Sequence, residues 1–232
     1  MDKYILFFCI ILIIIILCSC RTIQSFFNTT ENNITFIIPT IGRPTLINTI
    51  NCLINQTNTK WNAIIVFDGI KKNIDVTDSR IKIIEIEKKG KDINSAGLVR
   101  NEGMKYANSK WIAFVDDDDL LANDYVDTFY KEVEMYPLID VLIFRMYHRN
   151  NVFPRPIDNT FYKGKVGISF VINKKIVNDG LIFKPSRTED YDYLNLIREN
   201  KYKMMISPYI KYYVRGLKPN NLNEEYNRVF IN

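Results

Sequence analysis

From Ile34 onward the sequence alternates short apolar runs with segments of helical spacing, and this alternation restricts the possible folds more than any other feature. Runs such as Ile34–Ile38 and Trp111–Val115 have the length of strands and are rich in β-branched and aromatic residues, so they predict buried strands. Because strands and helices alternate at these lengths, we expect an α/β fold in which helices flank a mostly parallel central sheet. Ligands of such sheets bind beyond the carboxyl ends of the strands.

The pattern predicts a definite order of elements in one folded body. Strands are expected at 34–38, 61–67, 81–86, 111–115, 139–147 and 166–172, and two further β-type runs at 203–207 and 210–214. Helices are expected at 44–56, 95–108, 124–136 and 188–200. Since no internal repeat or linker separates these elements, we expect a single domain over 34–217 and a polar tail over 218–232.

An uncharged apolar segment, Tyr4–Cys20, precedes this body. Its length lies near the lower limit for a helix that crosses a bilayer, so it predicts single-pass membrane association. We expect 1–21 to be an uncleaved signal anchor, with a cleaved signal peptide as the alternative, and 22–33 to be a short stalk. The charges of Lys3 and Arg21 flank the segment on both sides and leave the orientation in the membrane undecided.

The overall composition excludes two classes of protein. Hydrophobic residues make up 47% of the chain, which is too many for a disordered protein and enough for a core. The formal net charge of +5 is small for 232 residues and is not concentrated in one basic block. We therefore expect no nucleic-acid partner.

Four consecutive acids, Asp116–Asp119, follow directly on the expected strand at 111–115. Like charges repel, so a cation is the natural reason to gather them at a strand end. In an extended segment Asp116 and Asp118 point to the same side and Asp117 points away. Carboxylates suit Mg²⁺ or Mn²⁺, and such ions are commonly shared with substrate phosphates. The pattern predicts a metal-bound nucleoside diphosphate; the alternative is a solvated acidic loop that caps the next helix.

Two other expected strand ends supply polar residues near the acids. The strand at 34–38 runs into Pro39-Thr-Ile-Gly-Arg-Pro44, and the strand at 61–67 ends at Asp68-Gly69. By itself, Asp68-Gly69 is typical of a turn. Because the carboxyl ends of neighbouring parallel strands lie side by side, we expect these residues to line one site.

In their order and spacing, five segments resemble the motifs of the family 2 glycosyltransferases with the GT-A fold. They are the Pro-Thr turn in 37–40, the strand and acid in 66–69, the Arg-Asn motif in 97–103, the DXD segment in 114–120, and the acceptor-side strand 167–172 followed by Glu189-Asp190. Each motif is weak alone, whereas the ordered set is specific. The resemblance covers roughly 34–216 and implies a GT-A glycosyltransferase domain over 34–217.

The resemblance implies roles for individual residues. The residues expected to bind the nucleotide sugar are Pro39, Thr40, Asp68, Arg100, Asp116 and Asp117. Asp118, with Asp116, is expected to bind Mn²⁺ or Mg²⁺. Asp190 is expected to be the general base, and the alternative for this residue is helix capping together with Glu189.

These roles describe one reaction. The metal neutralises the leaving diphosphate, and Asp190 takes the proton from the attacking hydroxyl. One base and no enzyme nucleophile imply a single displacement with inversion at the anomeric carbon. We expect transfer of one sugar from a nucleotide-diphospho-sugar, first of all a UDP-sugar, to a hydroxyl on a glycan, protein or lipid acceptor.

The sequence also departs from the family pattern. Many members carry a late His as a further metal or phosphate contact, but 212–218 contains none, which leaves Arg215 or Lys218 for the diphosphate. The alternatives are therefore a nucleotide-sugar-binding protein without transfer activity and, less favoured, a sugar nucleotidyltransferase. The latter needs a Gly-rich phosphate loop, which Pro39-Thr-Ile-Gly-Arg43 matches poorly.

Overall fold

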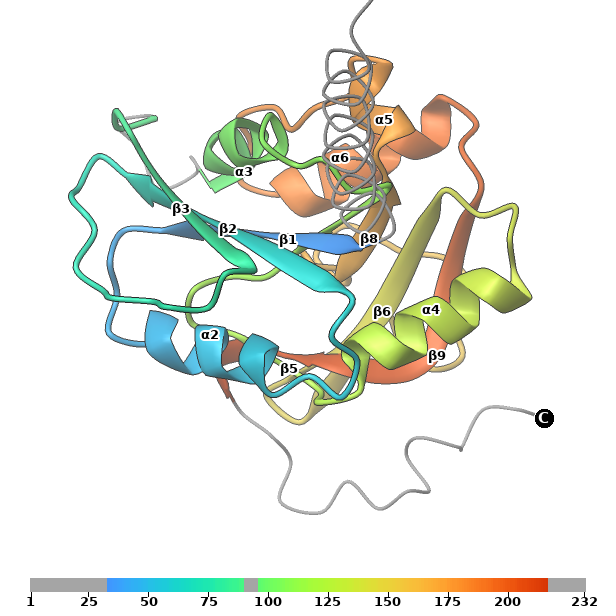
Figure 1. The fold of residues 1–232 in the computed structure, drawn as a ribbon. Helices are drawn as coiled ribbons and strands as arrows, with labels where there is room; N and C mark the ends of the chain where they lie inside the picture. Colours follow the sequence, from blue (N-terminus) through green and yellow to red (C-terminus); the bar gives the residue numbers. More distant parts are fainter. Residues whose placement is uncertain (1–32, 90–95, 217–232) are drawn as a thin grey trace, which may run out of the picture.

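The computed structural model describes residues 33–89 and 96–216 of the chain (Figure 1). The expected anchor at 1–21, nearly all of the expected stalk and the expected tail at 218–232 lie outside the described residues. Among the helices of the described part, none is long and apolar enough to cross a membrane.

One mixed sheet runs through the molecule, in the strand order β3-β2-β1-β4-β8-β6-β9-β5, with β7 paired to β6. Its strands are β1 (Ile34–Thr40), β2 (Trp61–Asp68), β3 (Ile81–Ile86), β4 (Trp111–Phe114), β5 (Leu120–Leu121), β6 (Val141–His148), β7 (Asn151–Phe153), β8 (Phe170–Asn173) and β9 (Met204–Tyr213). All seven residues of β1 are buried, as expected for a strand covered on both faces.

The prediction of a mostly parallel sheet is right for one half of the sheet, whereas the other half mixes antiparallel pairs with the parallel pair of β6 and β9. Strands β3, β2, β1 and β4 are parallel. Strand β8 is antiparallel to both β4 and β6. No helix lies between β6 and β8 to carry the described chain back across the sheet, so β8 starts at the edge where β6 ends and runs in the opposite direction.

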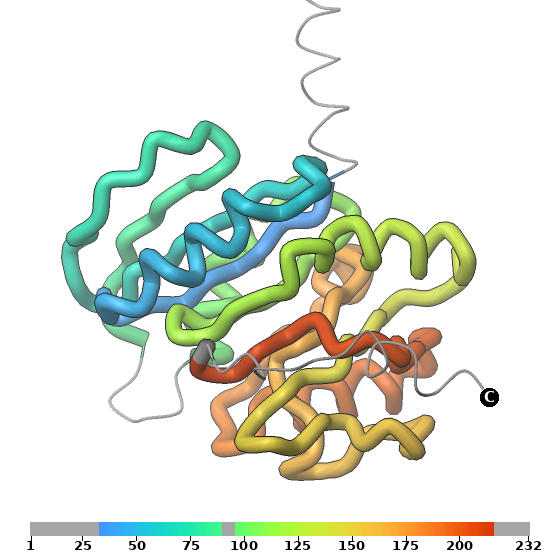
Figure 2. The backbone as a smooth tube through the Cα atoms, turned by 90° about the horizontal axis from the view of Figure 1, so that it is seen from below, coloured from blue at the N-terminus to red at the C-terminus, as the bar shows by residue number. Residues whose placement is uncertain are grey.

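Helices cover both faces of the sheet. They are α2 (Leu46–Ile54), α3 (Ala96–Met104), α4 (Tyr125–Met135), α5 (Lys175–Asn178) and α6 (Glu189–Glu199), and the 3₁₀ turn η1 (Val214–Gly216) follows β9. In Figure 1, α2 and α4 lie below the sheet, and α3, α5 and α6 lie above it. Figure 2, seen from below, shows α2 and α4 in front of the strands.

The close approach of α3 to the sheet depends on one glycine. A Cβ atom at Gly103 would lie 2.5 Å from Ile37 Cγ2 and 3.0 Å from Val66 Cγ2. Only a residue without a side chain allows this distance between the helix and β1 and β2. Arg100 lies one turn earlier on α3, so the same packing determines how deeply its side chain enters the molecule.

Some elements differ from their predicted form. The expected strand at 166–172 is reduced to β8, and the runs at 203–207 and 210–214 join into the single strand β9, which contains Pro208. The pairing of β9 with β6 shifts register between Ile143 and Met146, and such irregularities accommodate a proline inside a strand. Strands β5 and β7 and helix α5 were not predicted, because each has four residues or fewer.

Candidate active site

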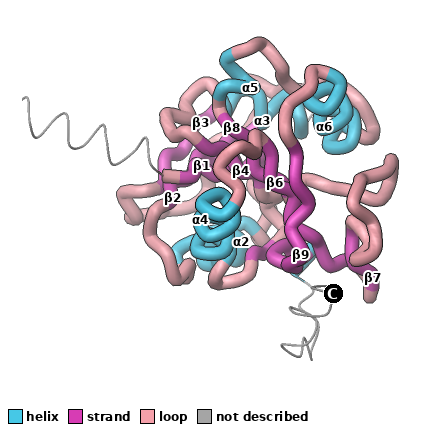
Figure 3. The backbone as a smooth tube through the Cα atoms, turned by 90° about the vertical axis from the view of Figure 1, so that its right-hand side faces the viewer, coloured by secondary structure: helices cyan, strands magenta, loops and turns pink. Residues whose placement is uncertain are grey.

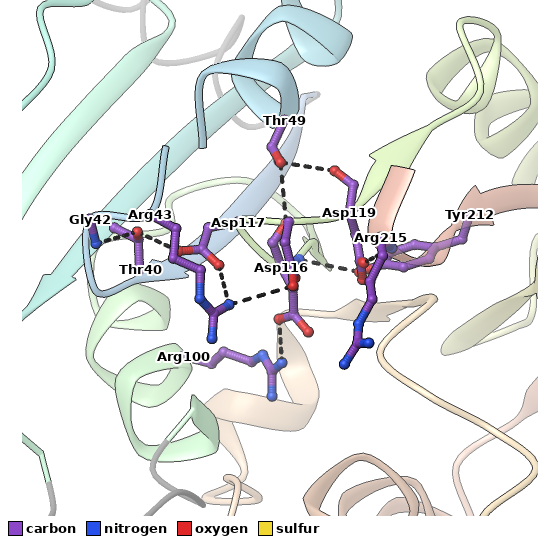
Figure 4. A network of polar contacts seen from close by, with 11 residues as sticks. Thr40, Gly42, Arg43, Thr49, Arg100, Asp116, Asp117, Asp119, Tyr212 and Arg215 are labelled. Carbon is purple, nitrogen blue, oxygen red and sulfur yellow. Dashed lines mark hydrogen bonds and ion pairs between the residues drawn. The ribbon is translucent and has the colours of Figure 1, made fainter. Parts of the chain in front are cut away.

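The four acids form a turn after β4 rather than an extended segment. The Asp119 N–H donates to the Asp116 carbonyl at 3.1 Å and closes the turn. The expected alternation, with Asp116 and Asp118 on one side, therefore does not apply. Each of the four carboxylates has its own surroundings, as Figure 4 shows for three of them. We refer to residues 116–119 as the acid turn.

Asp117 fastens the acid turn to the end of β1. Thr40 Oγ1 donates to Asp117 Oδ2 at 2.6 Å, and Arg43 donates to Oδ1 at 2.7 Å (Figure 4). Burial raises the pKa of Asp117, while the contacts with Thr40 and Arg43 oppose this shift. Both oxygens of Asp117 accept hydrogen bonds from protein groups, so the residue holds the acid turn in place against β1. Direct contact of Asp117 with the donor stays a prediction.

Asp119 fastens the acid turn to the end of β9. Its carboxylate accepts from the Tyr212 hydroxyl at 2.7 Å and from the Arg215 backbone N–H at 2.6 Å. The Tyr212 oxygen in turn accepts from the Asp116 N–H at 3.2 Å. Burial raises the pKa of Asp119 to about 7. Arg215 has φ 56° and ψ 35°, a left-handed conformation that is uncommon outside glycine and is held here by the bond to Asp119.

Arg100 joins the acid turn to the start of α6. Its guanidinium, only 1% exposed, donates to Asp116 Oδ1 at 2.6 Å, Glu189 Oε1 at 3.3 Å and Asp190 Oδ1 at 3.4 Å. Burial opposes the charge, but the three carboxylates outweigh it and raise the pKa of Arg100. Arg100 is thus buried among acids, and its predicted proximity to the nucleotide stays a prediction.

Asp190 lies at the start of α6 with its side chain 24% exposed. Burial raises the pKa of its carboxyl group to about 7, opposed by Arg100 and reinforced by Glu189 and Asp116. A carboxylate with a pKa close to neutral is well suited to accept a proton from a hydroxyl group. No side-chain hydrogen bond caps the helix, although both acids lie in its first turn.

Asp118 is the acid of the turn with the fewest protein contacts. Its side chain is 32% exposed, and its one ion pair with another described residue, Arg43, is long at 3.7 Å. Asp118 and Arg215 line one cavity of about 560 Å³ beside α2. No group of three or more His, Cys, Asp or Glu side chains in the described part is arranged to hold a metal. The side chains of Asp118 and Asp116 are both partly exposed, and an ion of the Mg²⁺ type needs only one or two carboxylates when phosphates complete its shell, so a metal at these two residues stays a prediction.

Asp68 lies two strands from the acid turn, at the end of β2. Pro39 and Thr40, at the end of neighbouring β1, pair in register with Val66 and Phe67. The Asp68 carboxylate is buried and accepts from the Lys89 N–H at 2.7 Å. The structure therefore places all the predicted donor residues at one edge of the sheet.

Several residues of this network were not predicted. They are Arg43, Thr49 and Tyr212, while Asp119 was predicted only as one of the four acids and Arg215 only as a contact for the diphosphate. Arg43 lies inside the Pro39–Pro44 segment and was within reach of sequence reasoning. Tyr212 is separated from Asp119 by 93 positions, and no local pattern indicates that the two side chains meet.

Comparison with known proteins is consistent with this geometry. Residues 35–191 match the family model Glycosyl transferase family 2. Glycosyltransferase GlyA of Streptococcus pneumoniae serotype 4 (strain ATCC BAA-334 / TIGR4) is 27% identical over 162 residues, which cover 66% of this chain and 21% of GlyA. Putative glycosyltransferase EpsH of Bacillus subtilis (strain 168) is 36% identical over 80 residues, which cover 32% of this chain and 22% of EpsH.

Solved structures show the same fold. S. aureus TarS has a TM-score of 0.64 at 18% identity, covering 81% of this chain and 37% of TarS. The mannosyltransferase PcManGT from Pyrobaculum calidifontis, solved with GDP-Man and Mn²⁺, has a TM-score of 0.57 at 15% identity, covering 83% of this chain and 59% of PcManGT. The chain spans about a fifth of the length of GlyA, so it corresponds to one part of that relative. Because the family model matches more than half of the sequence, this chain belongs to glycosyl transferase family 2.

Proposed function

We propose that the protein is a metal-dependent, inverting glycosyltransferase that moves one sugar from a UDP-sugar to a hydroxyl group of a glycan, protein or lipid. The observation that carries the proposal is the position of Arg100 between Asp116 and Asp190. It places a carboxylate suited to a metal and a carboxylate suited to a base on either side of one buried cation. The groups proposed for the two halves of a displacement reaction thereby share one guanidinium.

In this reaction the residues have separate tasks. Asp118 and Asp116 would hold Mn²⁺ or Mg²⁺, an ion that would supply charge neutralisation of the leaving diphosphate. Asp190 accepts the proton of the acceptor hydroxyl as that oxygen bonds to the anomeric carbon. Arg100 offsets the mutual repulsion of the neighbouring carboxylates and opposes the rise in the pKa of Asp190.

The identity of the donor rests on similar proteins. A fragment of TarS, residues 1–349, has been solved with UDP-GlcNAc, and PcManGT has been solved with GDP-Man and Mn²⁺. Both donors are nucleotide-diphospho-sugars, and both proteins share the fold of this chain. Asp68, Thr40 and Pro39 lie where the ends of β1 and β2 would border the nucleoside of such a donor.

A screen of UDP- and GDP-sugars tests the proposal. The full chain is incubated with each donor and Mn²⁺, with EDTA in a parallel set, and nucleoside diphosphate and the anomeric form of the released or transferred sugar are measured. We expect Mn²⁺-dependent release with an inverted anomer, and loss of most release in Asp190→Asn. Tight Mn²⁺-dependent binding without release from any donor would identify the non-catalytic alternative. Consumption of a nucleoside triphosphate with a sugar phosphate would identify a nucleotidyltransferase.

A further inference from the structure

The edge of the sheet opposite the acid turn carries basic residues beside most of its strands. The residues that flank the strands at this edge are Arg80 before β3, Lys60 before β2, Lys110 before β4, Lys174 after β8 and Lys203 before β9, with Asn33 before β1 and Asp140 before β6. Backbone hydrogen bonds tie several of them together: the Lys174 N–H donates to the Lys110 carbonyl at 2.8 Å, and the Asp140 N–H to the Lys203 carbonyl at 2.7 Å. We refer to Lys60, Lys110, Lys174 and Lys203 as the basic edge.

The positive charge of the basic edge is not neutralised within the described part of the chain. None of its four lysines forms an ion pair there. The acids Asp78 and Asp140 near this edge are paired with basic residues outside the four lysines. Arg80 contacts Asp78 at 2.6 Å, and Lys175 contacts Asp140 at 2.5 Å. Lys60 and Lys110 lie over the rings of Tyr130 and Trp111, contacts that leave their positive charge in place. A surface of lysines whose charge has no acidic partner attracts an anionic one.

Exposed apolar side chains adjoin the basic edge. The last residue of α4, Met135, is 69% exposed, and the connection that leads from it to Asp140 exposes Leu138 by 71% and Tyr136 by 46%. Large apolar side chains beside lysines are typical of surfaces that lie at the boundary between water and lipid head groups. The combination therefore fits a lipid surface better than it fits a purely polar polyanion.

The path of the chain points to the same partner. Strand β1 begins at this edge, and Figure 3 views the molecule from that side. The uncharged apolar segment Tyr4–Cys20 lies a short distance before β1 in the sequence. We propose that the basic edge, with Met135 and Leu138, is the surface on which the folded domain rests against an anionic membrane.

This orientation has a consequence for the acceptor. The acid turn and Asp190 lie toward the other ends of the strands, and a strand as long as β1, with seven residues, spans roughly 23 Å. The site would face away from the lipid surface. An acceptor hydroxyl that stands on the order of 20 Å above the head groups would reach it, whereas one at the head groups would not.

Lysine labelling on lipid nanodiscs tests the surface without measuring sugar transfer. The full chain is reconstituted into nanodiscs of phosphatidylcholine alone or with about 30% phosphatidylserine, and the acetylation rate of each lysine is measured by mass spectrometry. We expect Lys60, Lys110, Lys174 and Lys203 to react about fivefold more slowly on anionic nanodiscs, a factor that corresponds to one lysine near an anionic surface. Lys72, Lys163 and Lys184, which are exposed elsewhere, should react equally on both.

A matched pair of triple variants separates the effect of the basic edge from the effect of the protein's net charge. Lys60→Glu/Lys110→Glu/Lys203→Glu should abolish the protection of Lys174, while Lys72→Glu/Lys163→Glu/Lys184→Glu, with the same net charge, should keep it. Equal labelling of the wild-type basic edge on both lipids, or failure of the full chain to associate with nanodiscs, would overturn the proposal. So would protection by a nucleic-acid duplex in place of anionic lipid, because it would identify a different polyanion.

Discussion

The carboxyl group of Asp190 links the structure to the pH dependence of the reaction. Its pKa is raised to about 7, so below neutral pH it is protonated and cannot accept a proton. We expect kcat/KM to rise roughly tenfold per pH unit up to about pH 7 and then to level off. The check is kcat/KM between pH 5 and 9, with donor binding measured at each pH to separate binding from chemistry. A plateau that extends down to pH 5 would rule out this pKa for the base.

The Tyr212 hydroxyl connects Asp119 to the backbone of Asp116. Tyr212→Phe leaves the buried Asp119 carboxylate without one of its donors, so we expect the free energy of unfolding to fall by about 1–3 kcal/mol. Tyr209→Phe is the matched control, because the Tyr209 hydroxyl has no side-chain hydrogen bond within the described residues and should change stability little. Urea unfolding of both variants provides the comparison. Equal stability of Tyr212→Phe and wild type would contradict the assigned role.

At the scale of elements, the packing of α3 on β1 and β2 supports the position of Arg100. Gly103→Ala would bring a Cβ atom to 2.5 Å from Ile37 Cγ2 and push the helix outward. We expect a loss of about 1–3 kcal/mol in stability, together with a lower rate of transfer, since Arg100 moves with the helix. Lys105→Ala, at an exposed position just beyond α3, removes only a surface ion pair with Glu102 and should alter stability by less than about 0.5 kcal/mol. An unchanged melting temperature for Gly103→Ala would show that α3 accommodates the added methyl group and would contradict this prediction.

Several elements could be predicted from sequence because their signals are local. The apolar run at 81–86 matches β3, and the helices at 124–136 and 188–200 match α4 and α6 within one residue at each end. The direction of β8 could not be predicted, because it depends on which edge the chain has reached after β6. The union of two β-type runs into β9 was also missed, since Pro208 favours a break and only pairing with β6 keeps the strand continuous.

At the scale of the whole molecule, the order of the motifs predicted that distant segments meet at one edge of the sheet. The structure confirms that Thr40, the acid turn, Arg100 and Asp190 form one connected network. The contacts inside that network were beyond sequence reasoning. The four acids look equivalent in the sequence, yet Thr40, Arg100 and Tyr212 each bind a different one and leave Asp118 the most available.

Separating donor binding from transfer tests the central claim most directly. Binding of the active UDP-sugar to the full chain is measured by calorimetry with and without Mn²⁺, and transfer is measured in parallel, for wild type, Asp118→Asn and Asp190→Asn. We predict that binding requires Mn²⁺ and weakens at least about tenfold in Asp118→Asn, that Asp190→Asn binds like wild type, and that both variants lose transfer. Metal-independent binding, or full transfer by either variant, would contradict a metal held at the acid turn and a base at the start of α6.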